Sequence, residues 1–319
     1  MTTAVADTQT RLAEIVTIRQ EAVDILSFAL AAVDGATLPP FAAGAHIDLH
    51  IAPDRLRQYS LSNSTAERDR YLIAVKLEHG GRGGSRYLHE QVRVGSRIAV
   101  GAPRNTFHLP PGRAPLLFIA GGVGITPIRA MLHQAEYEGR DWQLHYAARS
   151  KHHTAFHDEL AAYGDRVRFW WSESGERLPT RDIIAEAGHV VLRCCGPERL
   201  MTEVEHATAA WHSDRVGFER FRGKLDDGVA NRPFDVELRR SGLRVHVPAD
   251  VSLLDALRSH GVDVPFACQE GVCGTCETRV LAGTIDHRDQ LLTEQERASG
   301  QVMMPCVSRA RSGKLVLDL

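Results

Sequence analysis

Short apolar runs separated by turn residues occupy the first 112 residues of the chain. The runs span residues 45–51, 58–62, 71–78 and 97–100. Their length and their β-branched and aromatic content are typical of strands. Turn signals separate them, at Pro53-Asp54, Gly80-Gly81 and Gly83-Gly84. This pattern predicts that residues 1–112 form an antiparallel β-barrel domain.

The pattern changes after Pro110-Pro111-Gly112. Apolar runs now alternate with segments of helical periodicity. We expect strands at 116–120, 143–147, 167–171 and 190–194, and helices from Thr126, near 155–163 and from 198 to 211. Such alternation is typical of an α/β domain with a parallel sheet, which we place at residues 113–225.

A polar, glycine-containing stretch over 224–232 is the best candidate for a linker, which we set at 226–232. The remaining domain, 233–319, begins with an expected strand pair at 234–239 and 244–248. Ser252 and Asp255 then have the spacing of a capping box at the start of a short helix.

Composition and charge exclude several classes of protein. The 319 residues carry a formal charge of -2, which argues against nucleic-acid binding. No apolar run approaches the roughly 18 residues of a membrane span, and residues 1–11 lack a signal-peptide core. We therefore expect a cytoplasmic protein without a membrane partner. Residues 233–319 hold 12 acidic and 10 basic residues, so they account for the whole formal charge.

Four of the six cysteines gather near the C-terminus with a spacing that indicates an iron–sulfur cluster. Three form C-x4-C-x2-C and the fourth follows after 29 intervening residues, which is the plant-type 2Fe–2S pattern. Glycines between them allow the loop to bend tightly around the inorganic sulfurs. A four-cysteine zinc site is the alternative, but it usually has two C-x2-C pairs. The expected ligands are Cys268, Cys273, Cys276 and Cys306. The segment resembles plant-type ferredoxins, which implies a β-grasp (α+β) fold.

A glycine-rich turn lies between an expected strand and an expected helix, at the sequence AGGVGITP. Bare amides and the positive end of a helix dipole can bind a diphosphate there, although a tight turn needs glycine in any case. Thr126 is the expected N-cap and Pro127 the expected first helical residue. The residues assigned to this nucleotide site are Gly121, Gly122, Gly124, Thr126 and Pro127. A second turn, Cys195, Gly196 and Pro197, follows the expected strand at 190–194.

The strand sequence RQYSLS over 57–62 forms a third motif. Strand alternation puts Arg57 and Tyr59 on one face and Gln58 and Ser60 on the other. Downstream, a second glycine-rich turn precedes a helical segment, with Ser85 as the expected N-cap, and it forms another anion site. Arg82 and Gly84 belong to this turn. Taken singly, the strand arginine could be an ordinary surface residue, and the glycine-rich turn could be an ordinary hairpin loop.

These motifs in this order resemble the ferredoxin–NADP reductase superfamily, and the whole chain resembles its phthalate dioxygenase reductase and vanillate demethylase reductase branch. The resemblance implies FMN bound by Arg57, Gln58, Tyr59 and Ser60, with Arg57 on the phosphate, Tyr59 stacked on the ring and Ser60 at its reactive edge. It places both glycine turns, including Gly196 and Pro197, at the pyridine nucleotide, with Cys195 beside the nicotinamide. It also places Glu219 and Phe221 facing the flavin. Ser60, Cys195 and Glu219 are the expected catalytic positions. We expect Ser60 and Cys195 to align and tune the reacting groups rather than to act as nucleophiles. An adjacent Cys194–Cys195 disulfide would be strained and is rejected.

The choice between NADH and NADPH depends on the end of the second α/β strand, where Arg149-Ser150-Lys151 replaces an acidic signature. We expect NADH with Arg149 at the site, and NADPH stays open. The expected function is a monomeric NADH-dependent reductase that passes electrons through FMN and a 2Fe–2S cluster to a separate Rieske oxygenase, acting on aromatic rings or O-methyl groups. A diiron hydroxylase or a cytochrome as acceptor, and a non-catalytic electron carrier, are the alternatives.

Overall fold

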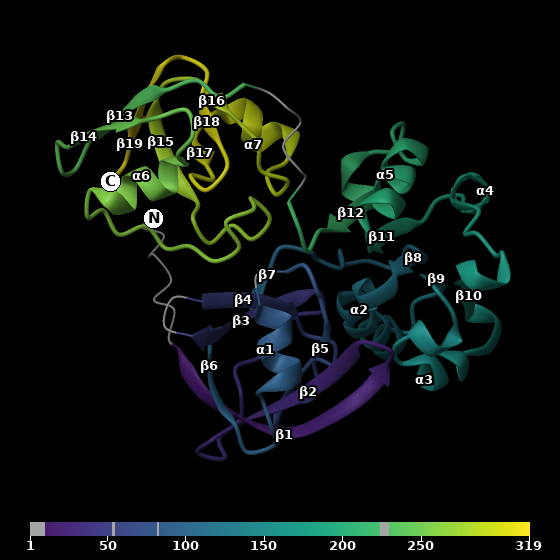
Figure 1. Ribbon diagram of the computed structural model, residues 1–319. Coiled ribbons are helices and arrows are strands. Elements are labelled where there is room, and N and C mark those ends of the chain that lie inside the picture. The colour runs from purple at the N-terminus through teal and green to yellow at the C-terminus, as the bar shows by residue number, and fades with distance from the viewer. Residues whose placement is uncertain (1–9, 53–54, 82, 224–229) are drawn as a thin grey trace. The chain divides into compact units, whose positions relative to one another are not determined.

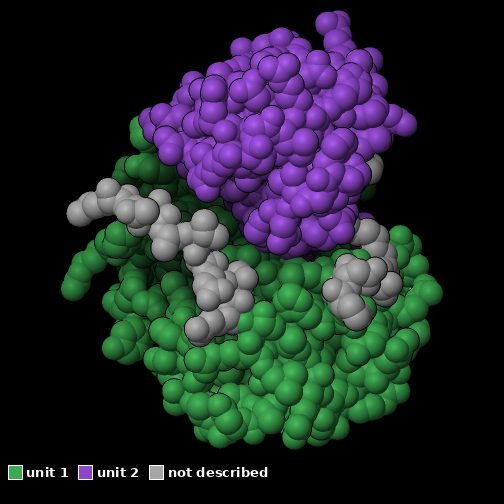
Figure 2. Space-filling model, turned by 90° about the vertical axis from the view of Figure 1, so that its left-hand side faces the viewer, with its two compact units in different colours: residues 1–219 green, residues 220–319 purple. Residues whose placement is uncertain are grey.

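The computed structural model describes residues 10–52, 55–81, 83–223 and 230–319. The chain divides into two compact units, residues 1–219 and residues 220–319, which Figure 2 shows in different colours. The expected boundary at 112/113 lies inside the first unit. Residues 226–229 of the expected linker lie outside the described ranges.

The first half of unit 1 is a sheet in which every strand pair is antiparallel (Figure 1). Among the described residues its order is β4-β3-β6-β1-β2-β5, with β7 paired to β3. The elements are β1 (Arg11–Ala22), β2 (Ile25–Ala32), β3 (Ala45–Ala52), β4 (Arg55–Ser60), β5 (Tyr71–Lys76), α1 (Gly84–Glu90), β6 (Arg97–Val100) and β7 (Arg104–Asn105). The fold is the expected barrel. The strands β1 and β2 were not predicted, since β1 is largely exposed and shows no clean alternation.

The second half of unit 1 is a parallel sheet, as expected, in the order β10-β9-β8-β11-β12. Its elements are β8 (Leu116–Gly121), α2 (Ile125–Glu138), β9 (Trp142–Ala148), α3 (His157–Ala161), β10 (Val167–Trp171), α4 (Thr180–Glu186), β11 (Val191–Cys195), α5 (Glu198–Ala207) and β12 (Val216–Glu219). The chain runs outward from β8 to β10, and then returns to the other side of β8. The order of strands therefore reverses between β8 and β11, and such a reversal is where open α/β sheets bind their ligands.

Two contacts show that the barrel and the parallel sheet form one body within unit 1. Arg129 of α2 donates from Nη1 to the carbonyl oxygen of Ser62, just after β4, at 2.6 Å. The amide of Val23, after β1, donates to the carbonyl oxygen of His152 at 2.9 Å. The ends of β4 and of the parallel strands therefore keep a defined relation to one another.

Unit 2 contains a mixed sheet of order β14-β13-β19-β15-β17 and a separate pair β16-β18. Only β13 and β19 pair in parallel among its described strands. The Ser252 hydroxyl accepts a hydrogen bond from the amide of Asp255 and caps α6 as predicted. The elements are β13 (Phe234–Leu238), β14 (Arg244–Val247), α6 (Leu253–Ser259), β15 (Thr278–Ala282), β16 (Ile285–Asp286), α7 (Glu294–Ser299), β17 (Val302–Met303), β18 (Arg309–Ala310) and β19 (Lys314–Leu317).

The apolar core of unit 2 extends to the cysteine segment. Cys276 and Cys306 belong to the same buried cluster as Met303 and Met304, whose side chains are fully buried. The two methionines therefore exclude water beside two of the expected ligands. None of the helices in the described ranges is long and apolar enough to cross a membrane.

Candidate functional site

The strand β4 brings the expected flavin residues to one edge of the barrel. It pairs with β3 so that Tyr59 lies opposite Ile47 and Ser60 opposite His46. Burial raises the pKa of Tyr59, so its hydroxyl stays protonated. Tyr59 is partly buried and packs against the barrel core.

The neighbour Gln58 is turned toward a buried acid on β3. Its Nε2 donates to Asp48 Oδ1 at 3.0 Å, and Arg104 Nη2 donates to the same oxygen at 2.7 Å. Asp48 is only 4% exposed, so the two donors compensate a carboxylate that is removed from water. The side chain of Gln58 therefore links β4 to β3 through Asp48. The sequence analysis did not identify Asp48 or Arg104.

Arg57 and the turn before α1 lie together, although 27 positions separate Arg57 from Gly84 in the sequence. A Cβ atom on Gly84 would lie 2.8 Å from Arg57 Cγ and 2.9 Å from Nε. Glycine at this position thus leaves room for the guanidinium stem. The structure thereby joins a cation with the first turn of α1, the pair of groups expected at the flavin phosphate.

The expected cap of α1 is wrong. The helix begins at Gly84 and its N-cap is Gly83, whose φ of 80° is left-handed. Ser85 lies inside the helix, and its hydroxyl accepts a hydrogen bond from the amide of Glu78 at 3.0 Å. The hydroxyl is therefore engaged with the preceding loop rather than with the helix. Arg82 lies outside the described residues.

A partly buried pair joins the end of β4 to the end of β12. The Ser60 hydroxyl donates to Glu219 Oε2 at 2.9 Å, across 159 positions of sequence. Burial raises the pKa of Glu219 to about 8, although the hydrogen bond from Ser60 acts in the opposite direction. Glu219 is therefore largely protonated at neutral pH. Two of the expected catalytic residues are in direct contact.

The two glycine turns of the parallel sheet pack against each other at the reversal between β8 and β11. A Cβ on Gly124 would lie 2.3 Å from the carbonyl oxygen of Cys195, and one on Gly121 would lie 2.6 Å from Pro197 Cδ. A Cβ on Gly196 would lie 3.0 Å from the amide nitrogen of Gly121. A Cβ on Gly124 or Gly121 would force its neighbours to move, and one on Gly196 would be tighter than an ordinary contact. Both turns thus present backbone to the carboxyl edge of the sheet.

The helix that follows the first turn begins differently from the prediction. A short 3-10 turn, Gly122–Gly124, runs directly into α2, so Gly124 is the N-cap and lacks a capping side chain. Thr126 is not the cap: its hydroxyl donates to the carbonyl oxygen of Val123 at 2.9 Å. Pro127 is the third helical residue, where its missing N–H would have no helical partner in any case.

Cys194 and Cys195 are both buried at the end of β11. Cys195 is 1% exposed and its carbonyl borders Gly124, which places it between the two glycine turns. Phe221 belongs to unit 2 and is 43% exposed.

Arg149 follows β9 and is held by an acid that follows β10. Its Nε donates to Glu173 Oε1 at 2.6 Å, and the Glu173 amide donates to the Arg149 carbonyl at 2.9 Å. Both side chains are substantially exposed, so the ion pair contributes little to stability. Its importance is local: the basic residue at this edge of the sheet already has a counter-charge. Glu173 was not identified from the sequence.

The four expected cluster ligands converge in unit 2. Cys276 Sγ and Cys306 Sγ lie 3.4 Å apart, and the amide of Glu270 donates to Cys268 Sγ at 3.3 Å. Gly271 and Gly274 have left-handed φ angles of 71° and 72°, which bend the loop as expected. The two glycines therefore contribute to the site by bending the backbone of the cysteine loop.

The ionisation of these thiols reflects their crowding. Hydrogen bonds from Cys273 and Cys306 lower the pKa of Cys268, whereas the same contacts and burial raise the pKa of Cys273 and Cys306. Neighbouring thiols cannot all ionise without a compensating cation. Among the described residues, no three His, Cys, Asp or Glu side chains are arranged around one point as for a single metal ion. A 2Fe–2S cluster has two irons that share the four thiolates.

Comparison with known proteins agrees with this geometry. Two family models match: a 2Fe-2S iron-sulfur cluster binding domain over residues 236–311 and an oxidoreductase NAD-binding domain over residues 118–180. Phenoxybenzoate dioxygenase subunit beta of Ectopseudomonas oleovorans is 45% identical over 302 residues, 93% of each chain. The solved structure of phthalate dioxygenase reductase is 38% identical, covers 98% of each chain and has a TM-score of 0.73. The chain belongs to the phthalate dioxygenase reductase family.

Members of this family are oxidoreductases that use FMN, NADH and a 2Fe–2S cluster. A self-sufficient cytochrome P450 monooxygenase of type IV also contains this module, at 40% identity and a TM-score of 0.90 over 97% of the chain. The chain spans only 41% of that P450. The same module thus occurs both as a separate chain and fused to a haem enzyme.

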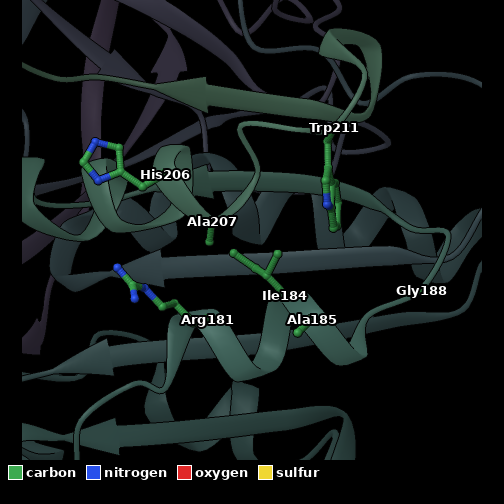
Figure 3. A pocket seen from close by; sticks show the side chains of 7 residues that line it. All are labelled: Arg181, Ile184, Ala185, Gly188, His206, Ala207 and Trp211. Carbon is green, nitrogen blue, oxygen red and sulfur yellow. The ribbon is translucent and has the colours of Figure 1, made fainter.

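A shallow cavity of about 460 Å³ lies between α4 and α5, away from these family motifs (Figure 3). It contains none of the expected site residues. Its lining residues are Arg181, Ile184, Ala185, Gly188, His206, Ala207 and Trp211.

Proposed function

We propose that this chain is the reductase component of a Rieske-type oxygenase system, which takes electrons from NADH and delivers them to a separate oxygenase protein. The observation that supports this most directly is the partly buried hydrogen bond between Ser60 and Glu219. It joins the flavin strand of the barrel to the nucleotide-binding sheet. The relatives named above are likewise components of dioxygenase systems.

The chemistry needs an adapter between a two-electron donor and a one-electron acceptor. When bound, FMN accepts a hydride from NADH and releases single electrons, which the 2Fe–2S cluster accepts one at a time. The work of the protein is to place and tune these groups. We assign Arg57 and the first turn of α1 to the flavin phosphate, and Tyr59 to the face of the ring.

Ser60 and Glu219 are assigned to the reactive edge of the flavin. The protonated carboxyl of Glu219 adds no negative charge beside a ring that is about to receive hydride. The Ser60 hydroxyl keeps that carboxyl oriented by donating to Oε2. The buried thiol of Cys195 lines the nicotinamide position between the two glycine turns and does not act as a nucleophile.

The preference for NADH follows from the pair formed by Arg149 and Glu173. A 2′-phosphate needs an uncompensated cation, whereas a ribose hydroxyl needs a carboxylate acceptor. Glu173 supplies the carboxylate and at the same time neutralises the cation. We therefore assign Glu173 to the discrimination between the two nucleotides.

A second candidate acceptor is a haem monooxygenase, because the chain matches the reductase module of the P450 at a TM-score of 0.90. We favour the Rieske partner because separate, full-length relatives carry dioxygenase names. The substrate of that partner is proposed to be an aromatic acid or aryl ether. We also propose that the reductase is monomeric and cytoplasmic.

The test begins with the purified, reconstituted protein under anaerobic conditions. We expect flavin and iron–sulfur absorption bands that bleach when NADH is added. Mixing with a Rieske oxygenase should then reduce its cluster, while mixing with a P450 of the type IV class, stripped of its own reductase module, should give much slower reduction. A colourless protein, or one that reduces only the haem protein, would contradict the proposal.

A further inference from the structure

Unit 2 holds a buried group of charged side chains close to the cysteine loop. The Asp289 side chain is fully buried, and the His287 side chain is 11% exposed. Asp289 Oδ1 lies 3.5 Å from His287 Nδ1, and Asp289 Oδ2 lies 3.6 Å from Arg297 Nη2. Within the described ranges, Asp289 Oδ1 has no hydrogen-bond partner. A carboxylate without water is costly, so its retention here needs an explanation.

The carboxylate of Asp289 shapes the turn that follows it. Its Oδ2 accepts hydrogen bonds from the amides of Leu292, at 2.9 Å, and Leu291, at 3.3 Å. Arg297 Nη2 donates to the Asp289 carbonyl oxygen at 2.5 Å, and Arg297 Nε donates to that of Leu292 at 3.0 Å. The conformation of residues 289–292 therefore depends on one buried acid and one arginine.

This turn packs against both glycines of the cysteine loop. The amide of Gln290 donates to the Gly271 carbonyl oxygen at 2.9 Å. A Cβ on Gly271 would lie 3.0 Å from Asp289 Cα, and one on Gly274 would lie 2.8 Å from Leu291 Cδ2. The turn therefore packs against the two glycines which, together with Gln269, have a left-handed backbone in this loop. Any shift of the turn would move the amides that surround the cluster.

We propose that Asp289 is a positioning residue of the iron–sulfur site, and that its buried charge lowers the reduction potential of the cluster. This inference rests on the proposed function only in assuming a 2Fe–2S cluster at the four cysteines. Reduction adds negative charge to the cluster, and a carboxylate in a low-dielectric surrounding opposes that addition. Arg297 and His287 both face the carboxylate, and the positive charge of Arg297 moderates the effect.

The test compares Asp289→Asn with a matched control, Asp235→Asn. Asparagine keeps an oxygen for the amides of Leu291 and Leu292 and removes only the charge. Asp235 also lies beside a histidine, His246, at 2.8 Å, but its side chain is 67% exposed. At a solution potential near the wild-type midpoint, Asp289→Asn should raise the ratio of reduced to oxidised cluster by at least about threefold, about 28 mV for one electron. The control should leave that ratio unchanged.

Redox titration followed by electron paramagnetic resonance, with iron content and melting temperature measured in parallel, supplies the readouts. Asp289→Asn should keep its iron and its melting temperature, which separates tuning from loss of structure. Should it lose iron, Arg297→Gln provides the second test, with the ratio expected to fall because a positive charge is removed.

Equal potentials in wild type, Asp289→Asn and Asp235→Asn would overturn the inference while leaving the proposed function intact. So would an unchanged or raised potential in Arg297→Gln. A wild-type protein without a 2Fe–2S spectrum would instead contradict the proposed function itself.

Discussion

At the scale of single residues, Glu219 has the most unusual environment of the expected catalytic groups. Burial raises its pKa to about 8, well above the usual range of a glutamate. The Ser60 hydroxyl donates a hydrogen bond to Glu219. This bond favours the ionised carboxylate, but it offsets only part of the effect of burial on the pKa. A buried acid poised near neutrality is typical of functional sites.

This environment predicts how flavin reduction depends on pH. As pH rises through about 8, Glu219 loses its proton, and a negative charge then opposes hydride arrival at the flavin. The rate of flavin reduction by NADH, measured by anaerobic stopped flow, should therefore fall across that range in wild type. Glu219→Gln should remove this decline. A decline of the same size in the variant would assign it to another group.

Glu173 predicts the preference between nucleotides. Glu173→Gln removes the carboxylate that binds Arg149 and leaves the arginine free for a 2′-phosphate. The ratio of kcat/KM for NADPH to that for NADH should rise by about tenfold or more, as expected for one charged contact. The neighbouring substitution Glu176→Gln is the control. A ratio that does not change would show that nucleotide choice depends on other residues.

At the scale of elements, the nucleotide site depends on how closely two turns approach. Gly124 and Gly121 bring the turn after β8 against the turn after β11, with Cys195 between them. The helix α2 then starts without a capping side chain. The amide of Ile125 is bonded to the carbonyl oxygens of Gly122 and Val123, and Pro127 has no amide hydrogen.

A single methyl group should therefore disturb this site. Gly124→Ala would put a Cβ 2.3 Å from the Cys195 carbonyl oxygen, which backbone atoms can avoid only by moving. We expect a loss of about 1–3 kcal/mol in stability and a rise of about tenfold or more in the KM for NADH. Gly80→Ala, which has open space around it, should change neither. Thermal melts and steady-state kinetics check both, and a normal KM in Gly124→Ala would contradict the assignment.

At the scale of the whole molecule, the cofactor sites are divided between two compact units. The flavin strand and the nucleotide turns lie in residues 1–219. The four cysteines expected to bind the iron–sulfur cluster lie in residues 220–319. The first half of the electron path should therefore work without the second.

Removal of iron tests this division. After chelation of iron under denaturant-free conditions, or in Cys306→Ser, NADH should still reduce ferricyanide through the flavin at half or more of the wild-type rate. Reduction of a one-electron protein acceptor should fall to a few per cent of its original rate. Reconstitution with iron and sulfide should restore it in the chelated wild type. Equal loss of both activities would show that the units depend on each other.

The sequence alone determined those parts of the site whose residues lie close together in the chain. The spacing of Cys268, Cys273 and Cys276 indicates a cluster because one tight loop must supply three ligands. The glycine turns can be predicted from the sequence for a similar reason, since each turn is formed by the backbone of consecutive residues. The alternation of strands and helices likewise predicts a parallel sheet from local pattern.

Only the tertiary structure decided which distant side chains meet. Ser60 and Glu219 are 159 positions apart, and Arg149 and Glu173 are 24 apart, so no local pattern records either pair. The expected caps at Ser85 and Thr126 were wrong because contacts with Glu78 and Val123 outweigh local preference. Packing determines these contacts, since the free energy of burial is gained only when the elements come together.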